Sequence, residues 1–113
     1  MHKRGYELVS PAFLLDEVTG KLEKLASKAG ISNEEISMAL NLLLSWIRII
    51  PNTEYLHFID EGKKISPDIK DAPYFALALK LKCPIWSREP RLKRQKTIVV
   101  LDNKDIETLL KAA

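Results

Sequence analysis

The stretch KDAPYFALALKLKCPIWSRE, residues 70–89, decides the fold class of this chain. It begins with an acid, Asp71, followed by a segment that is apolar on nearly every side of a helix, which predicts a buried helix. A short apolar strand, Pro84–Trp86, follows, and a second acid, Glu89, comes just beyond it. Continuous apolar strands between helices are typical of a parallel sheet covered on both faces. The stretch therefore predicts an α/β protein in which two distant carboxylates come to one end of a sheet.

The elements on either side of this stretch continue the alternation of strands and helices. We expect strands at Tyr6–Val9, Ile47–Ile50, Pro84–Trp86 and Ile98–Leu101. We expect helices from Ser10-Pro11 to Gly30 with Gly20 inside, from Ser32 with its capping-box Glu35, from Asn52 or Thr53 to near Gly62, from Asp71 to Leu81, and over Asp105–Leu110. The buried face of the second helix is expected to comprise Ile36, Leu40, Leu43, Leu44 and Ile47. This order predicts a single domain, residues 1–113, built as an α/β/α sandwich on a parallel sheet.

The composition excludes some classes of protein and leaves nucleic-acid binding open. No apolar run approaches the roughly 18 residues that span a bilayer. A lone cysteine, Cys83, cannot form an internal disulfide, which predicts a reducing, cytoplasmic location and a small buried side chain. His2 and His57 are isolated and lack the spacing of metal ligands. The net charge of +3 and the pI of about 9.0 permit binding to nucleic acid without establishing it.

Five basic side chains are concentrated around and after Glu89. They are Arg88, Arg91, Lys93, Arg94 and Lys96. Side chains that contact phosphates belong beside a site that acts on nucleic acid, so this segment is a candidate for phosphate binding. A solvated surface turn would have the same composition.

Three acids are expected at the carboxyl end of the predicted sheet, where such sheets bind ligands. Glu17 lies in the first turns of the helix after the first strand, Asp71 at a helix N-terminus, and Glu89 just after a strand. Their hard oxygen atoms suit Mg²⁺ or Mn²⁺, which lower the pKa of a bound water and stabilise charge on a phosphate. Each acid also has a purely structural interpretation, as a solvated helix residue, a helix cap and a turn residue respectively.

These motifs resemble those of the PIN domain, a family of Mg²⁺- or Mn²⁺-dependent nucleases that act mostly on RNA. The stretch SPAFLLDEV, residues 10–18, is similar to the family pattern in which the acid before an aliphatic residue belongs to the metal site. That similarity implies a metal-site role for Glu17. The stretch KDAPYFALAL, residues 70–79, is the closest match and implies the same role for Asp71.

The stretch PIWSRE, residues 84–89, matches the strand and the Ser/Thr-x-Asp motif that follow in the family. Ser87 fits the motif and would place water or phosphate. Glu89 stands where the family usually has Asp, and its extra methylene would move the carboxylate. The resemblance implies a supporting metal-site role for Glu89, with Arg88 as an unusual neighbour.

The family also opens with a strand that ends in an Asp, followed by a helix, and this chain has no counterpart of that unit. A βαβ unit needs roughly 30 residues or more, whereas only Met1–Gly5 precede Tyr6. In the family, the first strand lies between those matched by Tyr6–Val9 and Pro84–Trp86. A PIN-like fold truncated at the N-terminus is expected to cover the exposed strand edges by forming a homodimer or by binding a partner chain that completes the sheet. Metal binding by this chain alone is expected to be weak or absent.

The resemblance leaves three interpretations of function open. The first is a metal-dependent endoribonuclease acting on single-stranded RNA, as in toxin–antitoxin pairs or RNA processing. The second is a catalytically impaired remnant that binds RNA or protein, or that dimerises. The third is a subunit completed by a chain that carries the missing strand.

Overall fold

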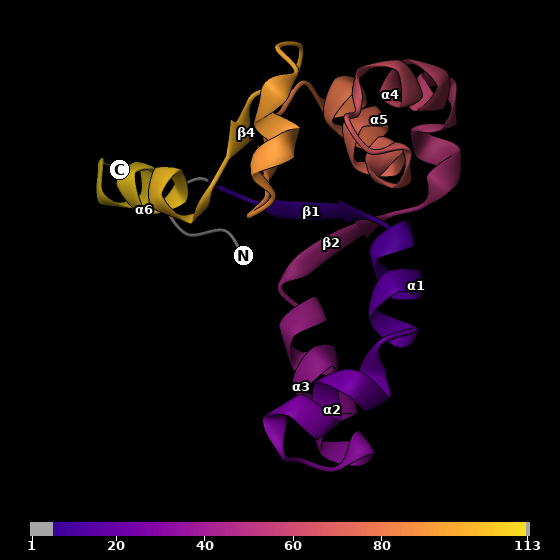
Figure 1. The fold of residues 1–113 in the computed structure, drawn as a ribbon, viewed down its shortest axis with the longest axis vertical. Coiled ribbons are helices and arrows are strands. Elements are labelled where there is room, and N and C mark those ends of the chain that lie inside the picture. The colour runs from indigo at the N-terminus through magenta and orange to yellow at the C-terminus, as the bar shows by residue number, and fades with distance from the viewer. Residues whose placement is uncertain (1–5, 113) are drawn as a thin grey trace. The chain divides into compact units, whose positions relative to one another are not determined.

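A computed structural model describes residues 6–112, shown in Figure 1. The chain divides into two compact units, unit 1 (Met1–Ile50) and unit 2 (Pro51–Ala113). The boundary falls at Pro51, whose ring leaves no N–H to continue the strand that ends at Ile50. Among the described residues, no helix combines the length and the apolar character that a bilayer crossing requires.

Unit 1 contains two parallel strands that lie side by side, β1 (Leu8–Pro11) and β2 (Ile47–Ile50). The prediction for β2 is confirmed. The prediction of Tyr6–Val9 for the first strand is two residues too early, because Ser10 and Pro11 pair in the ladder with Ile49 and Ile50.

The first helix of unit 1 consequently begins later than Ser10-Pro11. The N–H of Ala12 donates to the carbonyl of Ile50 across 2.9 Å, so the backbone stays tied to the sheet up to that residue. Ser10 and Pro11 are buried as strand residues rather than exposed as a helix start. The local sequence, Ser followed by Pro, is typical of a helix N-terminus. Pairing with a strand that is distant in the sequence keeps both residues in β1 instead.

Three helices complete unit 1: α1 (Phe13–Thr19), α2 (Leu22–Ala29) and α3 (Asn33–Leu44). The single helix expected to continue to Gly30 is therefore two helices. The break follows Gly20, where Lys21 adopts a non-helical backbone with φ −117° and ψ 6°. Gly30 ends α2 in the left-handed region at φ 71°, as predicted.

Helix α3 starts as predicted but is buried less than predicted. The Oγ of Ser32 accepts the N–H of Glu35 at 3.1 Å, and the N–H of Ser32 donates to the Glu35 carboxylate at 3.0 Å, which confirms the capping box. No residue of α3 is fully buried. Leu43, predicted on the buried face, is 57% exposed. Helix α3 lies beside α2.

Unit 2 contains three α-helices, four 3₁₀ turns and two strands in the described residues. The helices are α4 (Ile59–Ile65), α5 (Ala72–Leu81) and α6 (Asn103–Ala112). The turns are η2 (Asn52–Glu54), η3 (Leu56–Phe58), η4 (Ile69–Asp71) and η5 (Pro90–Arg94). The strands are β3 (Ile85–Trp86) and β4 (Val100–Leu101), each shorter than predicted, and they pair in parallel.

The helix predicted from Asn52 or Thr53 to near Gly62 differs most from the observed structure. Two 3₁₀ turns come first, and α4 then runs through Gly62 instead of ending there. The reason is packing, because a Cβ on Gly62 would lie 2.7 Å from the carbonyl oxygen of Ala72 and 3.0 Å from the backbone nitrogen of Ala76. Gly62 is therefore the position at which α4 approaches α5 most closely.

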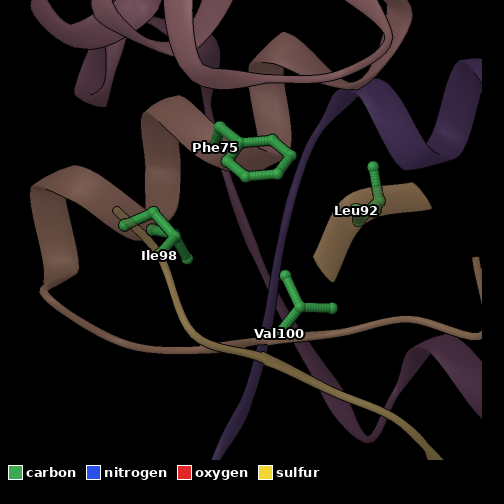
Figure 2. Packing of buried hydrophobic residues seen from close by; sticks show 5 residues of the cluster. Phe75, Leu92, Ile98 and Val100 are labelled. Carbon is green, nitrogen blue, oxygen red and sulfur yellow. The ribbon is translucent and has the colours of Figure 1, made fainter. Parts of the chain in front are cut away.

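Helix α5 confirms the central sequence prediction. Its buried residues are Ala72, Phe75, Ala76, Leu77 and Ala78. The core of unit 2 forms where this helix meets η5 and the segment leading into β4 (Figure 2). That core comprises Phe75, Ala78, Leu92, Ile98 and Val100.

The chain thus has a PIN-like α/β fold with parallel strands, which confirms the predicted fold class. The strands were expected to share one sheet. In residues 6–112 they form two two-stranded sheets instead, β1 with β2 and β3 with β4. A single domain over residues 1–113 stays a prediction.

Candidate functional site

The carboxyl edge of the β3–β4 sheet holds the second acid of the sequence motif. The N–H of Ser87 donates to the carbonyl of Leu101 at 2.9 Å, so the chain leaves both strands at the same edge. The Oγ of Ser87 then accepts the N–H of Glu89 at 3.0 Å. The two residues follow the strand as the sequence indicated, and the Ser87 hydroxyl helps to shape the turn that carries Glu89.

The Glu89 carboxylate is held by its own helical turn. It caps η5, where its Oε1 accepts the backbone N–H and the Nε–H of Arg91, each at 3.1 Å. These hydrogen bonds to Arg91 lower the pKa of Glu89, and the positive charges of Arg91 and Arg94 lower it further. The structural interpretation of Glu89 as a turn residue therefore has a concrete basis, and a metal would have to compete with Arg91 for this oxygen.

Arg91 also connects this turn to the segment that precedes α5. Its Nη2 lies 3.8 Å from the Oδ2 of Asp68, which in turn accepts the N–H of Lys70 through Oδ1. Asp71 follows three residues after Asp68 and is the N-cap residue of α5. Glu89 and Asp71 thus lie on segments of unit 2 that one arginine holds together.

Asp71 occupies the predicted position at the start of the buried helix. Its side chain is half-buried and makes no capping hydrogen bond, although Pro73 follows it in the first turn. The structural interpretation of Asp71 as a side-chain cap of α5 is therefore not supported by a capping hydrogen bond. An acid at a helix N-terminus is further stabilised in its charged form by the helix dipole.

Glu17 lies in unit 1, in the second half of α1. It is half-buried, whereas the neighbouring Asp16 is exposed. The metal-site role of Glu17 stays a prediction. Glu17 and Asp71 belong to different units, so the structure defines the setting of each carboxylate within its own unit.

The candidate acids fit a divalent cation in kind. Carboxylate oxygens are the ligands that Mg²⁺ and Mn²⁺ prefer. Within residues 6–112, however, no three His, Cys, Asp or Glu side chains come together in a group that could hold a metal ion. One oxygen of Glu89, Oε1, is already bound to Arg91.

The predicted basic segment divides into paired and exposed side chains. Arg91 is paired as described, and the Nζ of Lys93 lies 2.9 Å from Asp102 and 3.0 Å from Asp105. These two cations are partly neutralised and support the fold around η5. The remaining members of the segment are exposed, and they are Arg88, Arg94 and Lys96.

Asp102 is a carboxylate at this edge that the sequence analysis did not select. It directly follows β4 and forms a reciprocal cap with Asp105, each backbone N–H donating to the other's carboxylate at 3.0 and 2.9 Å. The bond from the Asp105 backbone, followed by that from Lys93, lowers the pKa of Asp102 to about 2. The signal was present in TIVVLDNKD, residues 97–105, as an acid after an apolar strand with a second acid three residues later.

Cys83 and His57 do not enter this site. Cys83 is half-buried against the core of unit 2, and burial raises the pKa of its thiol. It behaves as the small apolar side chain that was expected. His57 is exposed in η3, and His2 lies outside the described residues.

A family model described as PIN domain matches residues 1–109. The matched range contains Glu17, Asp71, Ser87 and Glu89. No curated protein and no solved structure matches the chain.

Proposed function

This chain belongs to the PIN domain family, and from that premise we propose that it acts on single-stranded RNA as a Mg²⁺- or Mn²⁺-dependent endoribonuclease. Family membership suggests a nuclease-type function in general. RNA as the substrate and cleavage within the strand are the further steps of the proposal. RNA processing and the toxin of a toxin–antitoxin pair are the two settings in which such an activity is expected.

In this proposal, Glu17 and Asp71 bind the metal ion. The observation that carries the proposal is the place of Asp71, which is the half-buried N-cap residue of the buried helix α5. When bound, the ion would activate a water and stabilise charge on the scissile phosphate. Ser87 and Glu89 have supporting roles at the carboxyl edge of β3, where Ser87 orients the turn through its bond to the Glu89 N–H.

We expect cleavage by this chain alone to be slow. Glu89 carries an extra methylene relative to the usual Asp, and Arg91 holds its oxygen at 3.1 Å. A displacement of about 1 Å at a reacting centre can cost on the order of 10²-fold in rate. Binding of RNA does not depend on this geometry, because the exposed Arg88, Arg94 and Lys96 attract phosphates without a metal.

The test is cleavage of end-labelled single-stranded RNA in Mn²⁺, comparing the wild-type chain with Glu17→Gln and Asp71→Asn. The matched controls are Asp16→Asn, next to Glu17, and Asp60→Asn, an exposed acid of α4. The proposal predicts weak cleavage that both site substitutions abolish and both controls retain. Cleavage that survives Glu17→Gln and Asp71→Asn would contradict the proposal and indicate a contaminating nuclease.

A second candidate function is binding of RNA or protein without cleavage. One observation favours it, the pairing of Glu89 with Arg91. It predicts RNA binding in the presence of a chelator and no cleavage under any metal.

The RNA-binding surface can be tested separately from cleavage. Neutralising Arg88, Arg94 and Lys96 to Gln should weaken binding and reduce the slope of log K against log salt by about 2 to 3. Neutralising three exposed lysines of the α2 region, Lys21, Lys24 and Lys28, makes the same change in net charge and is the control. Equal loss from both triple variants would show that net charge, and not this segment, accounts for the binding.

A further inference from the structure

The β3–β4 sheet has one face turned toward the core of unit 2 and one face turned away from it. Ile85 packs against that core, and Val100, its register partner in β4, belongs to it. Successive side chains of a strand point to opposite faces, so Trp86 and its register partner Leu101 lie on the other side. We name this side the outer face of the sheet. Trp86 is 49% exposed there.

Arg88 lies on the outer face as well, just beyond the end of β3. The N–H of Ser87 donates to the carbonyl of Leu101 at 2.9 Å, so the ladder continues past Trp86. Exposure alternates along this segment, because Trp86 and Arg88 are exposed whereas Ile85 and Ser87 are half-buried. An exposed indole and an exposed guanidinium group therefore belong to one surface, two residues apart.

The indole of Trp86 is held in place by the start of α6. Its Nε1–H donates to the Oδ1 of Asn103 at 2.9 Å. That bond satisfies the one polar group of the ring and restricts its rotation, while about half of the residue stays open to solvent. A side chain that is ordered before it binds a ligand loses less entropy on binding. Trp86 is therefore a preformed aromatic surface.

The segment that surrounds this indole carries an excess of positive charge. Residues 86–105 contain six basic and three acidic side chains. Each of the three acids bonds to a basic side chain of the same segment. The pairs are Glu89 with Arg91, and Asp102 and Asp105 with Lys93. The acids near the outer face are thus partly neutralised, and the excess of cations attracts an anionic ligand.

We propose, on the premise of the proposed function, that Trp86 stacks on a base of single-stranded RNA while Arg88 binds a neighbouring phosphate. The surface requires a ligand that combines an aromatic ring with an anion, and a nucleotide has both. The bases of a duplex are stacked on one another, so a single indole suits an unpaired base. Stacking tolerates every base, so this contact places the strand beside Ser87 without reading its sequence.

The first test measures binding to single-stranded RNA in a chelator, where metal-dependent cleavage does not occur. Trp86→Leu keeps an apolar side chain but has no ring, and it should weaken binding roughly 5- to 150-fold, as expected for the loss of one stacked base. Trp86→Phe keeps a ring and should bind within about threefold of the wild-type chain. The matched control is Trp46→Leu, the same change at a tryptophan of unit 1 that is 55% exposed. It should bind like the wild-type chain, and circular dichroism establishes that each variant is folded.

The salt dependence of binding separates stacking from phosphate contact. Trp86→Leu removes no charge, so it should leave the slope of log K against log salt unchanged. Arg88→Gln should reduce that slope by about 0.7, the value for one phosphate contact on a single strand. A change of slope in Trp86→Leu would contradict a neutral stacking contact.

A second measurement needs no substitution at Trp86. In a Trp46→Phe background, Trp86 is the sole tryptophan of the chain. Single-stranded RNA should quench its fluorescence, whereas an abasic strand of the same length, which keeps the phosphates, should not.

Two results would overturn the stacking contact and leave RNA binding intact. They are equal quenching by the two strands, and equal binding of RNA by Trp86→Leu and the wild-type chain. The second result would also open the outer face to another kind of occupant, such as a protein. A wild-type chain that binds no RNA would contradict both the stacking contact and the proposed function.

Discussion

Helix α5 of unit 2 and the helices of unit 1 are similar in length but are buried very differently. In unit 2, α5 has five buried residues and packs against α4, η5 and the segment before β4. In unit 1, α1 and α3 have no fully buried residue, and α2 has only Ala26. Apolar composition does not explain the difference, because α3 is itself rich in leucine. The difference lies in how many elements surround each helix.

This contrast teaches where the chain is stable by itself and where it depends on contacts beyond its own unit. A helix enclosed on all sides has its apolar surface removed from water by the fold. A helix enclosed on one side leaves apolar surface that favours association. Unit 2 therefore supplies a core and the acid Asp71, whereas unit 1 supplies Glu17 on a helix without a fully buried residue.

The largest effect is expected from removing the centre of the unit 2 core. Phe75 is 0% exposed, and Phe75→Ala should lower the free energy of unfolding by about 3–5 kcal/mol through lost burial and the cavity left behind. Urea denaturation measures the change. Leu56→Ala, which truncates a side chain that is 57% exposed, is the control and should cost far less. If the two variants lost similar amounts of unfolding free energy, Phe75 would not be the centre of a distinct core.

The second prediction compares the same substitution, glycine to alanine, at one glycine in each unit. A Cβ on Gly62 would lie 2.7 Å from the backbone oxygen of Ala72, so Gly62→Ala should cost on the order of 1–3 kcal/mol by forcing α4 away from α5. Gly20 is the matched site, since its backbone is helical and the nearest atom to its Cβ is 3.5 Å away. Gly20→Ala should be neutral or stabilising by up to about 1 kcal/mol. Thermal unfolding of both variants tests this, and a tolerated Gly62→Ala would show that α4 and α5 do not pack so closely.

The third expected effect is a difference in local opening between the units. Amides of α1 and α2 should exchange with solvent at least about tenfold faster than those of α5 after correction for intrinsic rates, because fewer buried contacts resist their opening. Hydrogen exchange followed by mass spectrometry or NMR measures it. Equal protection across both units would mean that the chain opens only as a whole, and the contrast between the units would not extend to stability.

The smallest expected effect concerns the carboxyl edge of β4. The pKa of Asp102 is about 2 when folded, below its usual 3.8, so this group contributes stability that is present above about pH 4 and is lost as the pH falls through about 2. Asp102→Asn keeps an oxygen to accept the Asp105 N–H but removes the charge. It should lower the urea midpoint at pH 7 and match the wild-type chain near pH 2. If the urea midpoints of the two proteins differed equally at every pH, the effect of Asp102→Asn would come from altered packing and not from the lost charge.

The features predicted correctly from the sequence are those that depend on neighbouring residues. The capping box of Ser32 with Glu35, the left-handed Gly30 and the apolar run of α5 each involve only a few consecutive positions. The pairing that moved β1 to Leu8–Pro11 depends on β2, nearly forty residues further along the chain. Local propensity cannot encode that contact.

The site shows the same limit. Asp71 and Ser87 lie where their motifs indicated, because each position follows from the element beside it. Charge clustering in the sequence could not predict that Glu89 bonds to Arg91. Nor could it predict that Lys93 forms ion pairs with Asp102 and Asp105. A run of basic residues reveals its charge but not which acids the fold brings to it.

The central claim is that the PIN-type chemistry of this chain centres on Asp71 together with Glu17. Isothermal titration of Mn²⁺ into the wild-type chain, Asp71→Asn and Asp60→Asn tests it most directly. The account predicts weak binding by the wild-type chain and by Asp60→Asn, and binding at least about tenfold weaker in Asp71→Asn, because one of few carboxylate ligands is lost. Indistinguishable titrations of the wild-type chain and Asp71→Asn would contradict the claim and remove Asp71 from the site.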